Sequence, residues 1–279
     1  MRGLIVGLAL FFLWATVRRH GGAIASLSFS DLRWPWVALG FTLTLLSHAW
    51  AGWVWAWLLA PFAPTPLSPP WAIRTYLTTT IAKYIPGNVW QFYGRIQAAQ
   101  GQGVPLAGAT VATLTEPLLM AAAALILALL TWPGGLRFWQ IPLLITLLCA
   151  LHPRPLNWGL GLLNKVKGSN LEIQAYPWGP LAGELLFVGG RSLGFLCTIL
   201  ALMPLRGAEI PQVISAFAVA WVLGLILPGA PGGLGVFESV AVGLLSPQFL
   251  LPIGLFRLSN TLAEALGAGL AWLIQTLHR

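Results

Sequence analysis

One long apolar run, from Trp34 to Ala60, constrains this chain more than any other feature. It holds 27 residues and no Asp, Glu, Lys or Arg, and a helix needs about 20 apolar residues to cross a bilayer. Similar runs recur along all 279 residues, of which 57% are hydrophobic and only 8% are charged. A soluble domain carries about 25% charged residues, so the sequence predicts an all-α polytopic membrane protein with a single integral membrane domain over residues 1–279.

The apolar segments predict about eight membrane elements, because several of them are too short to cross a bilayer alone. A polar loop over residues 153–177 links two structural halves, roughly 1–152 and 178–279. The segments are Gly3–Val17, Trp34–Ala60, Trp71–Gln100, Val104–Trp132, Leu136–Leu151, Pro180–Leu205, Ile210–Leu227, Val236–Leu245 and Gln248–Leu277. Among these, Leu136–Leu151 is a marginal span and Val236–Leu245 is too short to be one.

The net charge of +8 is explained by Lys and Arg near the ends of apolar segments, where they set orientation and meet anionic headgroups. No block of like charge indicates a nucleic-acid partner. Cys149 and Cys197 lie in apolar runs and the four histidines are scattered. We therefore expect no metal site and no cofactor.

Two of the predicted helices are broken. "IAKYIPGNVWQFYGR" covers Ile81–Arg95, and "ILPGAPGGLGVFES" covers Ile226–Ser239. Non-helical backbone in hydrocarbon leaves N–H and C=O groups unsatisfied, so such breaks persist only where protein or a hydrated cavity satisfies them. The residues that break the helices are Pro86, Gly87, Pro228, Gly229, Pro231, Gly232, Gly233 and Gly235.

The two breaks occupy corresponding positions in the two halves. Each follows a long span and a shorter apolar stretch, and each precedes a short segment and another long span. Paired Gly/Pro-interrupted segments of this kind point to the central site of a transporter. They predict two discontinuous or re-entrant helix pairs, a two-fold internal repeat, and helix N-termini suited to an anion such as a phosphate. The alternative is that both breaks are ordinary loops.

Several charged residues lie inside the predicted spans, where each costs about 2.5–3.5 kcal/mol by insertion scales. They are Glu116, Glu184, Arg191, Arg257 and Glu264, and Lys83, Arg95 and Glu238 flank the two breaks. Together they predict a polar, hydrated cavity in the middle of the bundle. Two alternatives stay open: buried ion pairs that only fix the packing, or Glu184 and Arg257 lying near helix ends and reaching the interface.

Two stretches, "KYIPGNVWQ" (Lys83–Gln91) and "PGGLGVFES" (Pro231–Ser239), resemble the signature stretches of the lysylphosphatidylglycerol synthase/flippase transmembrane domain family. The resemblance extends from Trp34 to the C-terminus. It implies a stand-alone helical bundle, without the soluble synthase domain, that moves a lipid headgroup across the bilayer. Carried over by motif, it marks Lys83, Tyr84, Pro86, Gly87, Asn88, Gln91, Pro231, Gly232, Gly233, Gly235, Glu238 and Arg257. The chain departs from the family at Pro117, where an arginine often follows the glutamate.

These observations predict a lipid translocator, flippase-like or scramblase-like, and not an enzyme, since no Ser/His/Asp set, metal-ligand set or ATP-binding GxxxxGK[ST] motif is present. The expected substrate is a phospholipid or a polyprenyl-phosphate-linked lipid with an anionic or zwitterionic headgroup, in a bacterial inner membrane. A secondary transporter for a small soluble solute or ion is the alternative, and homo-oligomerisation stays open. The candidate substrate-binding residues are Lys83, Tyr84, Asn88, Gln91, Arg95, Glu116, Arg191, Glu238, Arg257 and Glu264.

Overall fold

A computed structural model of the chain describes residues 32–85, 89–135, 137–158, 161, 175–227 and 231–277. This part is helical and contains no strand. The predicted first segment, Gly3–Val17, and most of the polar loop lie outside the described residues. The longer helices are α2 (Trp34–Leu59), α3 (Pro69–Thr80), α4 (Trp90–Gln100), α5 (Leu106–Leu130), α6 (Gln140–Ala150), α8 (Trp178–Leu202), α9 (Ile210–Ile226), α10 (Val236–Leu245) and α11 (Leu250–Leu277).

Short 3₁₀ turns join or end several of these helices. They are η1 (Ala60–Phe62), η2 (Ile81–Tyr84), η3 (Gly207–Glu209), η4 (Pro231–Gly233) and η5 (Pro247–Phe249).

Four segments of the described chain are long and apolar enough to cross a membrane: Trp34–Phe62, Leu106–Leu130, Trp178–Leu202 and Gly207–Ile226. They correspond to α2, α5, α8 and α9, and they make the chain an integral membrane protein. Helix α11 has 28 residues and would reach about 42 Å at 1.5 Å per residue. It is not among the four, and it carries Arg257, Asn260 and Glu264 on its buried side.

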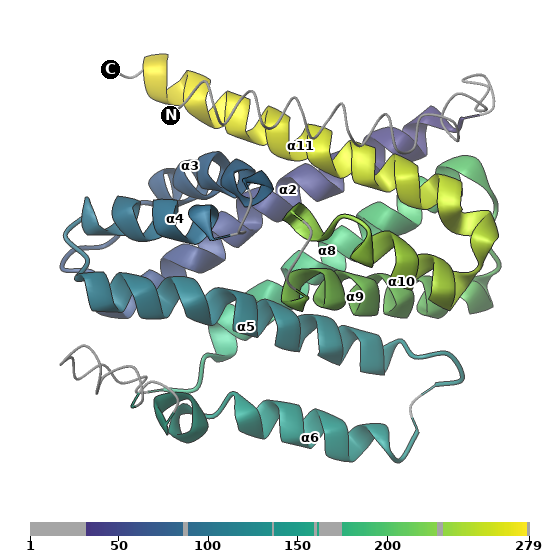
Figure 1. Cartoon of the computed structure of the whole chain (residues 1–279), viewed down its shortest axis with the longest axis horizontal. Helices are drawn as coiled ribbons and strands as arrows, with labels where there is room; N and C mark the ends of the chain where they lie inside the picture. The colour runs from purple at the N-terminus through teal and green to yellow at the C-terminus, as the bar shows by residue number, and fades with distance from the viewer. Residues whose placement is uncertain are drawn as a thin grey trace.

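The predicted span Leu136–Leu151 is wrong. Helix α6 has only 11 residues, about 16 Å at 1.5 Å per residue, which is half of what the hydrocarbon requires. The residues that precede it form a turn in which Gly134 and Gly135 adopt positive φ, 90° and 79°. Backbone used for that turn is not available to lengthen the helix, and α6 lies at the edge of the bundle (Figure 1).

Two helical hairpins approach each other at the centre of the molecule. Helices α3 and α4 form the first, with η2 at its tip, and α9 and α10 form the second, with η4 at its tip. The two tips are in contact, so that a Cβ added to Gly232 would lie 3.1 Å from the Tyr84 ring. Figure 1 shows the hairpins on opposite sides of the bundle, with α5 and α11 running along both.

Small residues bring α2 and α8 together. A Cβ added to Gly40 would lie 2.9 Å from the backbone oxygen of Gly194, and the Trp50 indole donates to the carbonyl of Gly183 at 2.8 Å. Close backbone approach of this kind is how helices associate in lipid, where the hydrophobic effect does not drive them together. The resulting α2–α8 pair forms a fixed wall behind the two hairpin tips.

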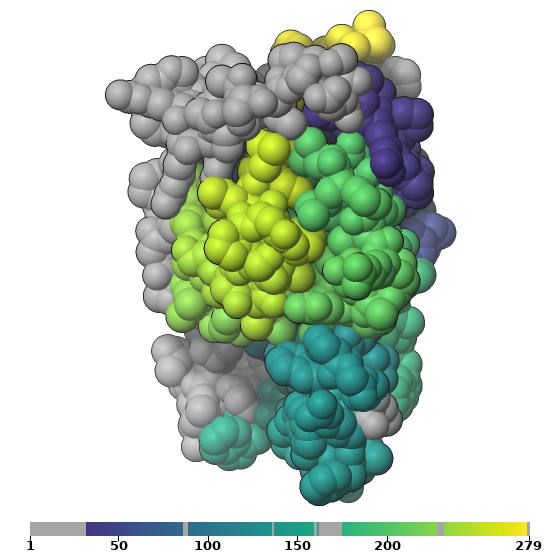
Figure 2. Space-filling model, turned by 90° about the vertical axis from the view of Figure 1, so that its right-hand side faces the viewer, coloured from purple at the N-terminus to yellow at the C-terminus, as the bar shows by residue number. Residues whose placement is uncertain are grey.

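Four phenylalanines hold the second hairpin against α8 and α11. Phe195, Phe217, Phe237 and Phe256 come from α8, α9, α10 and α11, and every pair of their rings lies between 5.2 and 6.1 Å apart. Such offset and edge contacts add to the energy of burial. In Figure 2, the connection between α10 and α11, in yellow-green, packs beside the green connection between α8 and α9 and closes this end of the bundle.

Candidate functional site

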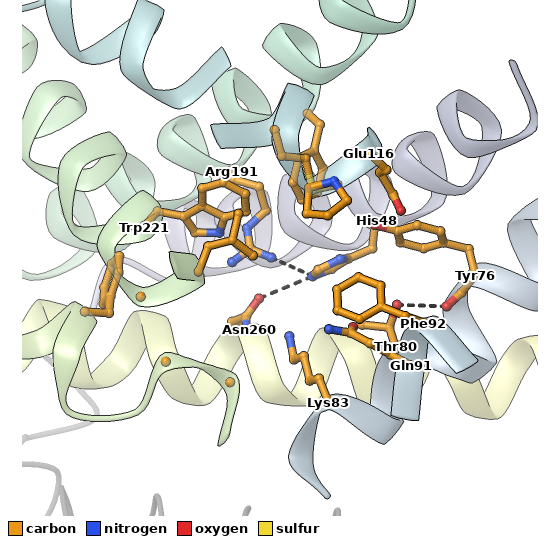
Figure 3. Close-up of a pocket in the computed structure, with 18 of the residues that line it drawn as sticks. His48, Tyr76, Thr80, Lys83, Gln91, Phe92, Glu116, Arg191, Trp221 and Asn260 are labelled. Atoms are coloured by element: carbon orange, nitrogen blue, oxygen red, sulfur yellow. Dashed lines mark hydrogen bonds between the residues drawn. The ribbon is translucent and has the colours of Figure 1, made fainter. Parts of the chain in front are cut away.

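A polar cavity lies where the two hairpin tips meet the long helices (Figure 3). The cavity has a volume of about 110 Å³. This leaves room for several water molecules. His48, Glu116 and Arg191 line it and lie close to the middle of α2, α5 and α8. Since these are three of the helices long enough to cross a membrane, the cavity lies about halfway along their length.

Glu264 of α11 is the centre of the largest polar cluster. One of its carboxylate oxygens accepts from the Lys83 ammonium at 2.6 Å and from the Asn260 amide at 2.9 Å. The other accepts from the Tyr84 hydroxyl at 2.9 Å. The Glu264 side chain is only 1% exposed, so these bonds replace its hydration and tie the tip of the first hairpin to α11.

Arg191 of α8 has no carboxylate within close hydrogen-bonding distance. Its guanidinium donates to Nε2 of His48 at 2.6 Å and lies 4.0 Å from Glu264, and its Nε has no partner within the described chain. Nε2 of His48 also lies 3.2 Å from a Glu264 oxygen and 3.3 Å from the Asn260 amide oxygen. In Figure 3, dashed lines join this nitrogen to Arg191 and to Asn260.

Arg95 of α4 and Glu116 of α5 form a second buried pair. One Arg95 nitrogen lies 2.6 Å from a Glu116 oxygen, another donates to Thr80 at 3.1 Å, and the guanidinium stacks 3.6 Å above the Tyr76 ring centre. Arg95 is 3% exposed and Glu116 is 1% exposed. Glu116 thus finds its cation on a neighbouring helix.

Arg257 of α11 and Glu238 of α10 form a third pair, beside η4. Nε of Arg257 lies 2.8 Å from Glu238, and another nitrogen donates to the Gly232 carbonyl at 3.0 Å. The second Glu238 oxygen accepts from the backbone N–H of Gly235 at 2.6 Å. Glu238 therefore caps the N-terminus of its own helix, and the arginine, rather than free N–H groups, presents positive charge there.

The glycines of the second break are required by its backbone. Gly232, Gly233 and Gly235 have φ of 63°, 69° and 90°, in the region that only glycine enters without strain. A Cβ on Gly233 would also lie 2.9 Å from the Gly224 carbonyl oxygen. This turn lets the tip of the hairpin lie flat against α9 while its carbonyl reaches Arg257.

The cluster of charged residues at the cavity has a surplus of one positive charge. We call it the central cluster: Lys83, Arg95, Arg191 and Arg257 are its cations, and Glu116, Glu238 and Glu264 are its anions. Three close ion pairs, of 2.6, 2.6 and 2.8 Å, use every anion once. Arg191 is the cation left over, and it lines the cavity.

The structure brings most of the candidate residues together. The central cluster contains seven of the ten, Tyr84 bonds to Glu264, and the buried Gln91 lines the cavity. Asn88 lies outside the described residues, as do Pro86, Gly87, Pro228 and Gly229. Pro231 is placed in the backbone of η4, and its side chain is not described.

The alternative that placed Glu184 and Arg257 at the interface is wrong. Glu184 is fully buried and Arg257 is 9% exposed. Glu184 and Arg191 of α8 are seven residues apart, as are Arg257 and Glu264 of α11, and neither couple forms an ion pair along its helix. Arg257 pairs with Glu238 of α10, and Arg191 turns towards His48 of α2, because the neighbouring helices lie closer than two helical turns.

Reasoning from charge alone missed His48 and Asn260. His48 is the one ionisable side chain in the run from Trp34 to Ala60, and an ionisable residue inside a span indicates a functional site by default. Asn260 lies three residues after Arg257 and four before Glu264, on the same face of a helix. Both positions could have been found from the sequence.

Neither protein-family models nor curated proteins give a match to this chain. The fold and the site therefore define its class by themselves: a helical integral membrane protein with a cavity among its long helices that is lined by buried charged and polar side chains.

Proposed function

We propose that this protein translocates a lipid with an anionic headgroup by moving that headgroup through the central cavity. The observation that carries the proposal is Arg191, a buried cation without a close carboxylate partner that lines the cavity among the long helices. Burying such a charge costs several kcal/mol unless a partner compensates it. A phosphate group supplies that partner through charge-assisted hydrogen bonds, and an arginine is well suited to hold it.

The two hairpins support a transport function. The described elements follow the same order twice: α2, the α3–α4 hairpin and α5, then α8, the α9–α10 hairpin and α11. We interpret this order as a two-fold internal repeat with two re-entrant helix pairs and, counting the segments outside the described residues, about eight membrane elements. Transporters with interrupted helices in both halves bind their substrate where the interruptions meet.

In the proposed mechanism, the contacts that hold the hairpin tips to the long helices break and re-form during transport. Lys83 holds η2 to Glu264, and Arg257 holds η4 through the Gly232 carbonyl. An anionic headgroup that binds Arg191 also attracts Lys83 and Arg257 and weakens those contacts. Each tip then becomes free to move away in turn, so that the cavity opens first to one side and then to the other, while the acyl chains stay in the bilayer.

The proposal includes membership of the lysylphosphatidylglycerol synthase/flippase transmembrane family, on the strength of the two signature stretches. Membership implies a bacterial inner membrane and a phospholipid or polyprenyl-phosphate-linked lipid as substrate. The proposed contacts to the headgroup are Lys83, Arg95, Arg191 and Arg257, with Gln91 and Tyr84 as neutral partners. The small size of the cavity also suits a small soluble anion, which is the second candidate.

Reconstitution into liposomes tests the proposal. We expect the wild-type chain to move a headgroup-labelled phosphatidylglycerol between leaflets faster than protein-free liposomes do. Arg191→Gln removes one charge-assisted bond worth about 1.5–3 kcal/mol, so transfer should fall roughly 10- to 100-fold. Arg206→Gln, at an exposed arginine, is the matched control and should keep the wild-type rate.

Two results would overturn the proposal. Wild-type liposomes that move the lipid no faster than empty ones exclude translocation by the purified chain. Uptake of radiolabelled inorganic phosphate without any movement of lipid would assign the cavity to the soluble-anion transporter instead.

A further inference from the structure

Glu184 of α8 is a buried carboxyl for which the central cluster has no cation. Its side chain is fully buried, and neither carboxylate oxygen has a hydrogen-bond partner in the described part of the chain. The preceding residue, Gly183, packs against Val54 and Trp57 of α2, which carry no charge. Glu184 also does not line the cavity, so cavity water does not replace its missing partners.

The charged groups that interact with Glu184 come from two other elements. Glu116 of α5 and Arg95 of α4 are the groups whose charge acts on it, and both also act on Tyr76 of α3 beside them. Helices α2, α9 and α11 also pack against α8. The charged or titratable groups of these helices in the described chain are His48, Arg257 and Glu264. None of them is bonded to Glu184: His48 contacts Arg191, and Arg257 and Glu264 bond to the hairpin tips.

This neighbourhood contains two carboxyl groups and one guanidinium. Arg95 is already committed to Glu116 at 2.6 Å and to Thr80 at 3.1 Å. If both carboxyls were ionised, Glu184 would be a carboxylate with no cation and no hydrogen bond in a dry interior, which proteins avoid by binding a proton. Burial without a partner therefore favours the neutral, protonated form of Glu184.

Glu116 is the carboxyl of this neighbourhood that meets the cavity. It lines the cavity beside Arg95, and its Oε1 has no hydrogen-bond partner within the described chain. A proton on a cavity water can therefore bind to this oxygen once Arg95 no longer neutralises the carboxylate.

We infer that Arg95, Glu116 and Glu184 form a proton-binding site that couples entry of the anionic group to uptake of one proton. The coupling rests on the proposed translocation, whereas the proton on Glu184 does not. When the headgroup binds Arg95, the guanidinium leaves Glu116, and Glu116 takes a proton from a cavity water that had received it from bulk solvent. The bound anion and the bound proton then cancel in charge, and the proton returns to solvent on the side where the headgroup leaves.

Infrared spectroscopy of the purified full-length chain in nanodiscs tests the proton site directly. At neutral pH the wild type should show the C=O stretching band of a protonated carboxyl, which shifts in D₂O. Glu184→Gln should lose this band. Glu209→Gln, at the partly exposed glutamate of η3 that accepts from the backbone N–H of Arg206, should retain it, and Glu184→Asp should retain a band at a shifted frequency if the glutamine variant fails to fold.

Transport under an imposed pH gradient tests the coupling. In proteoliposomes, wild-type transfer of headgroup-labelled phosphatidylglycerol should be faster when the donor side is acidic, and Glu116→Gln, at the carboxyl that takes up the proton, should lose that response. A wild type without the carboxyl band, a band that persists in Glu184→Gln, or a band abolished by sodium chloride would each overturn the proton site. A wild type that shows the band and moves the lipid at a rate indifferent to the gradient would overturn the coupling alone.

A wild type that moves no lipid at all would end the proposed function and, with it, the coupling. The infrared result on Glu184 would still decide the proton site by itself. The proton site and the coupling can therefore be refuted independently of each other.

Discussion

Neutralising Glu264 should destabilise the protein more than any other single charge removal in the central cluster. The change Glu264→Gln keeps the shape of the side chain but removes the anion that lies 2.6 Å from Lys83 and 4.0 Å from Arg191. Lys83 then loses its ion-pair partner, and Arg191 loses its nearest negative charge, at a site where the glutamate was 1% exposed. Breaking a buried pair from one side costs about 3–5 kcal/mol, because the partner charge stays buried without compensation.

The loss should be recovered in part when the stranded cation is also removed. In Lys83→Met/Glu264→Gln the ammonium is replaced by an apolar chain of similar length, and the uncompensated charge at the tip of the first hairpin disappears. We expect the double variant to be more stable than the sum of the two single changes by about 1–3 kcal/mol. The measurement is equilibrium unfolding in mixed micelles, followed by tryptophan fluorescence, for the wild type and the three variants.

The matched control is Glu209→Gln. Glu209 accepts one hydrogen bond from the backbone of Arg206 at 2.7 Å, so its replacement should cost about 0.5–1.5 kcal/mol. If Glu264→Gln unfolds within about 0.5 kcal/mol of the wild type, the range of ordinary surface changes, the view of Glu264 as the anchor of the hairpin tip is refuted. An additive double variant would likewise show that Lys83 and Glu264 do not interact.

Two further predictions concern glycines and are read from unfolding free energies. Gly40→Ala places a Cβ 2.9 Å from the Gly194 carbonyl oxygen and should lower the free energy of unfolding by about 1–3 kcal/mol. Its control is Gly189→Ala, where an added Cβ meets nothing within 4 Å and should be stabilising by about 0.5–1 kcal/mol. Equal effects of the two changes would contradict the close α2–α8 contact. Gly233→Ala forces φ of 69° on an alanine, so it should lower the free energy of unfolding by about 1–3 kcal/mol and slow lipid transfer. Its control is Gly243→Ala, where an added Cβ meets nothing within 4 Å; this change should leave stability and transfer unchanged or improve stability. A Gly233→Ala variant of wild-type stability would show that the hairpin tip does not need this backbone conformation.

The sequence predicts the long helices well because apolar length is a local property. Trp34–Ala60, Val104–Trp132 and Pro180–Leu205 each end within a few residues of α2, α5 and α8. The failure at Leu136–Leu151 is also local in origin. A hydropathy window does not register that the Gly134–Gly135 turn shortens the helix that follows it.

The candidate site was predictable as a set of residues and not as a set of pairs. Charged residues inside apolar spans can be recognised as candidate site residues from the sequence, because burying a charge in the membrane is energetically unfavourable. Their partners do not, since Lys83 and Glu264 lie 181 positions apart and meet only when the first hairpin folds against α11. Arg257 and Glu264 are seven residues apart on one helix, too far for the usual i, i+4 pairing, and each has its partner on another element.

The residues that were missed show the limit of counting formal charge. His48 and Asn260 do not enter a count of formal charges at neutral pH, yet Arg191 contacts one of them and Glu264 the other. Inserting a neutral polar side chain into a membrane span costs less free energy than inserting a charged one. Such a residue is therefore a weaker signal of a functional site in the sequence. Its role becomes visible only once the cavity has been located.

The most direct test of the central claim is whether water-soluble reagents reach the cavity at mid-membrane. In a chain with Cys149 and Cys197 replaced by alanine, Met120→Cys places a thiol in the cavity lining and Leu118→Cys places one on the exposed outer face of the same helix, α5. The thiolate is the reactive form and is disfavoured in an apolar medium. We predict that an anionic methanethiosulfonate modifies Met120→Cys in intact membranes and leaves Leu118→Cys unmodified. No reaction at Met120→Cys, with the folded protein confirmed by its unfolding curve, would show a dry interior and contradict the account.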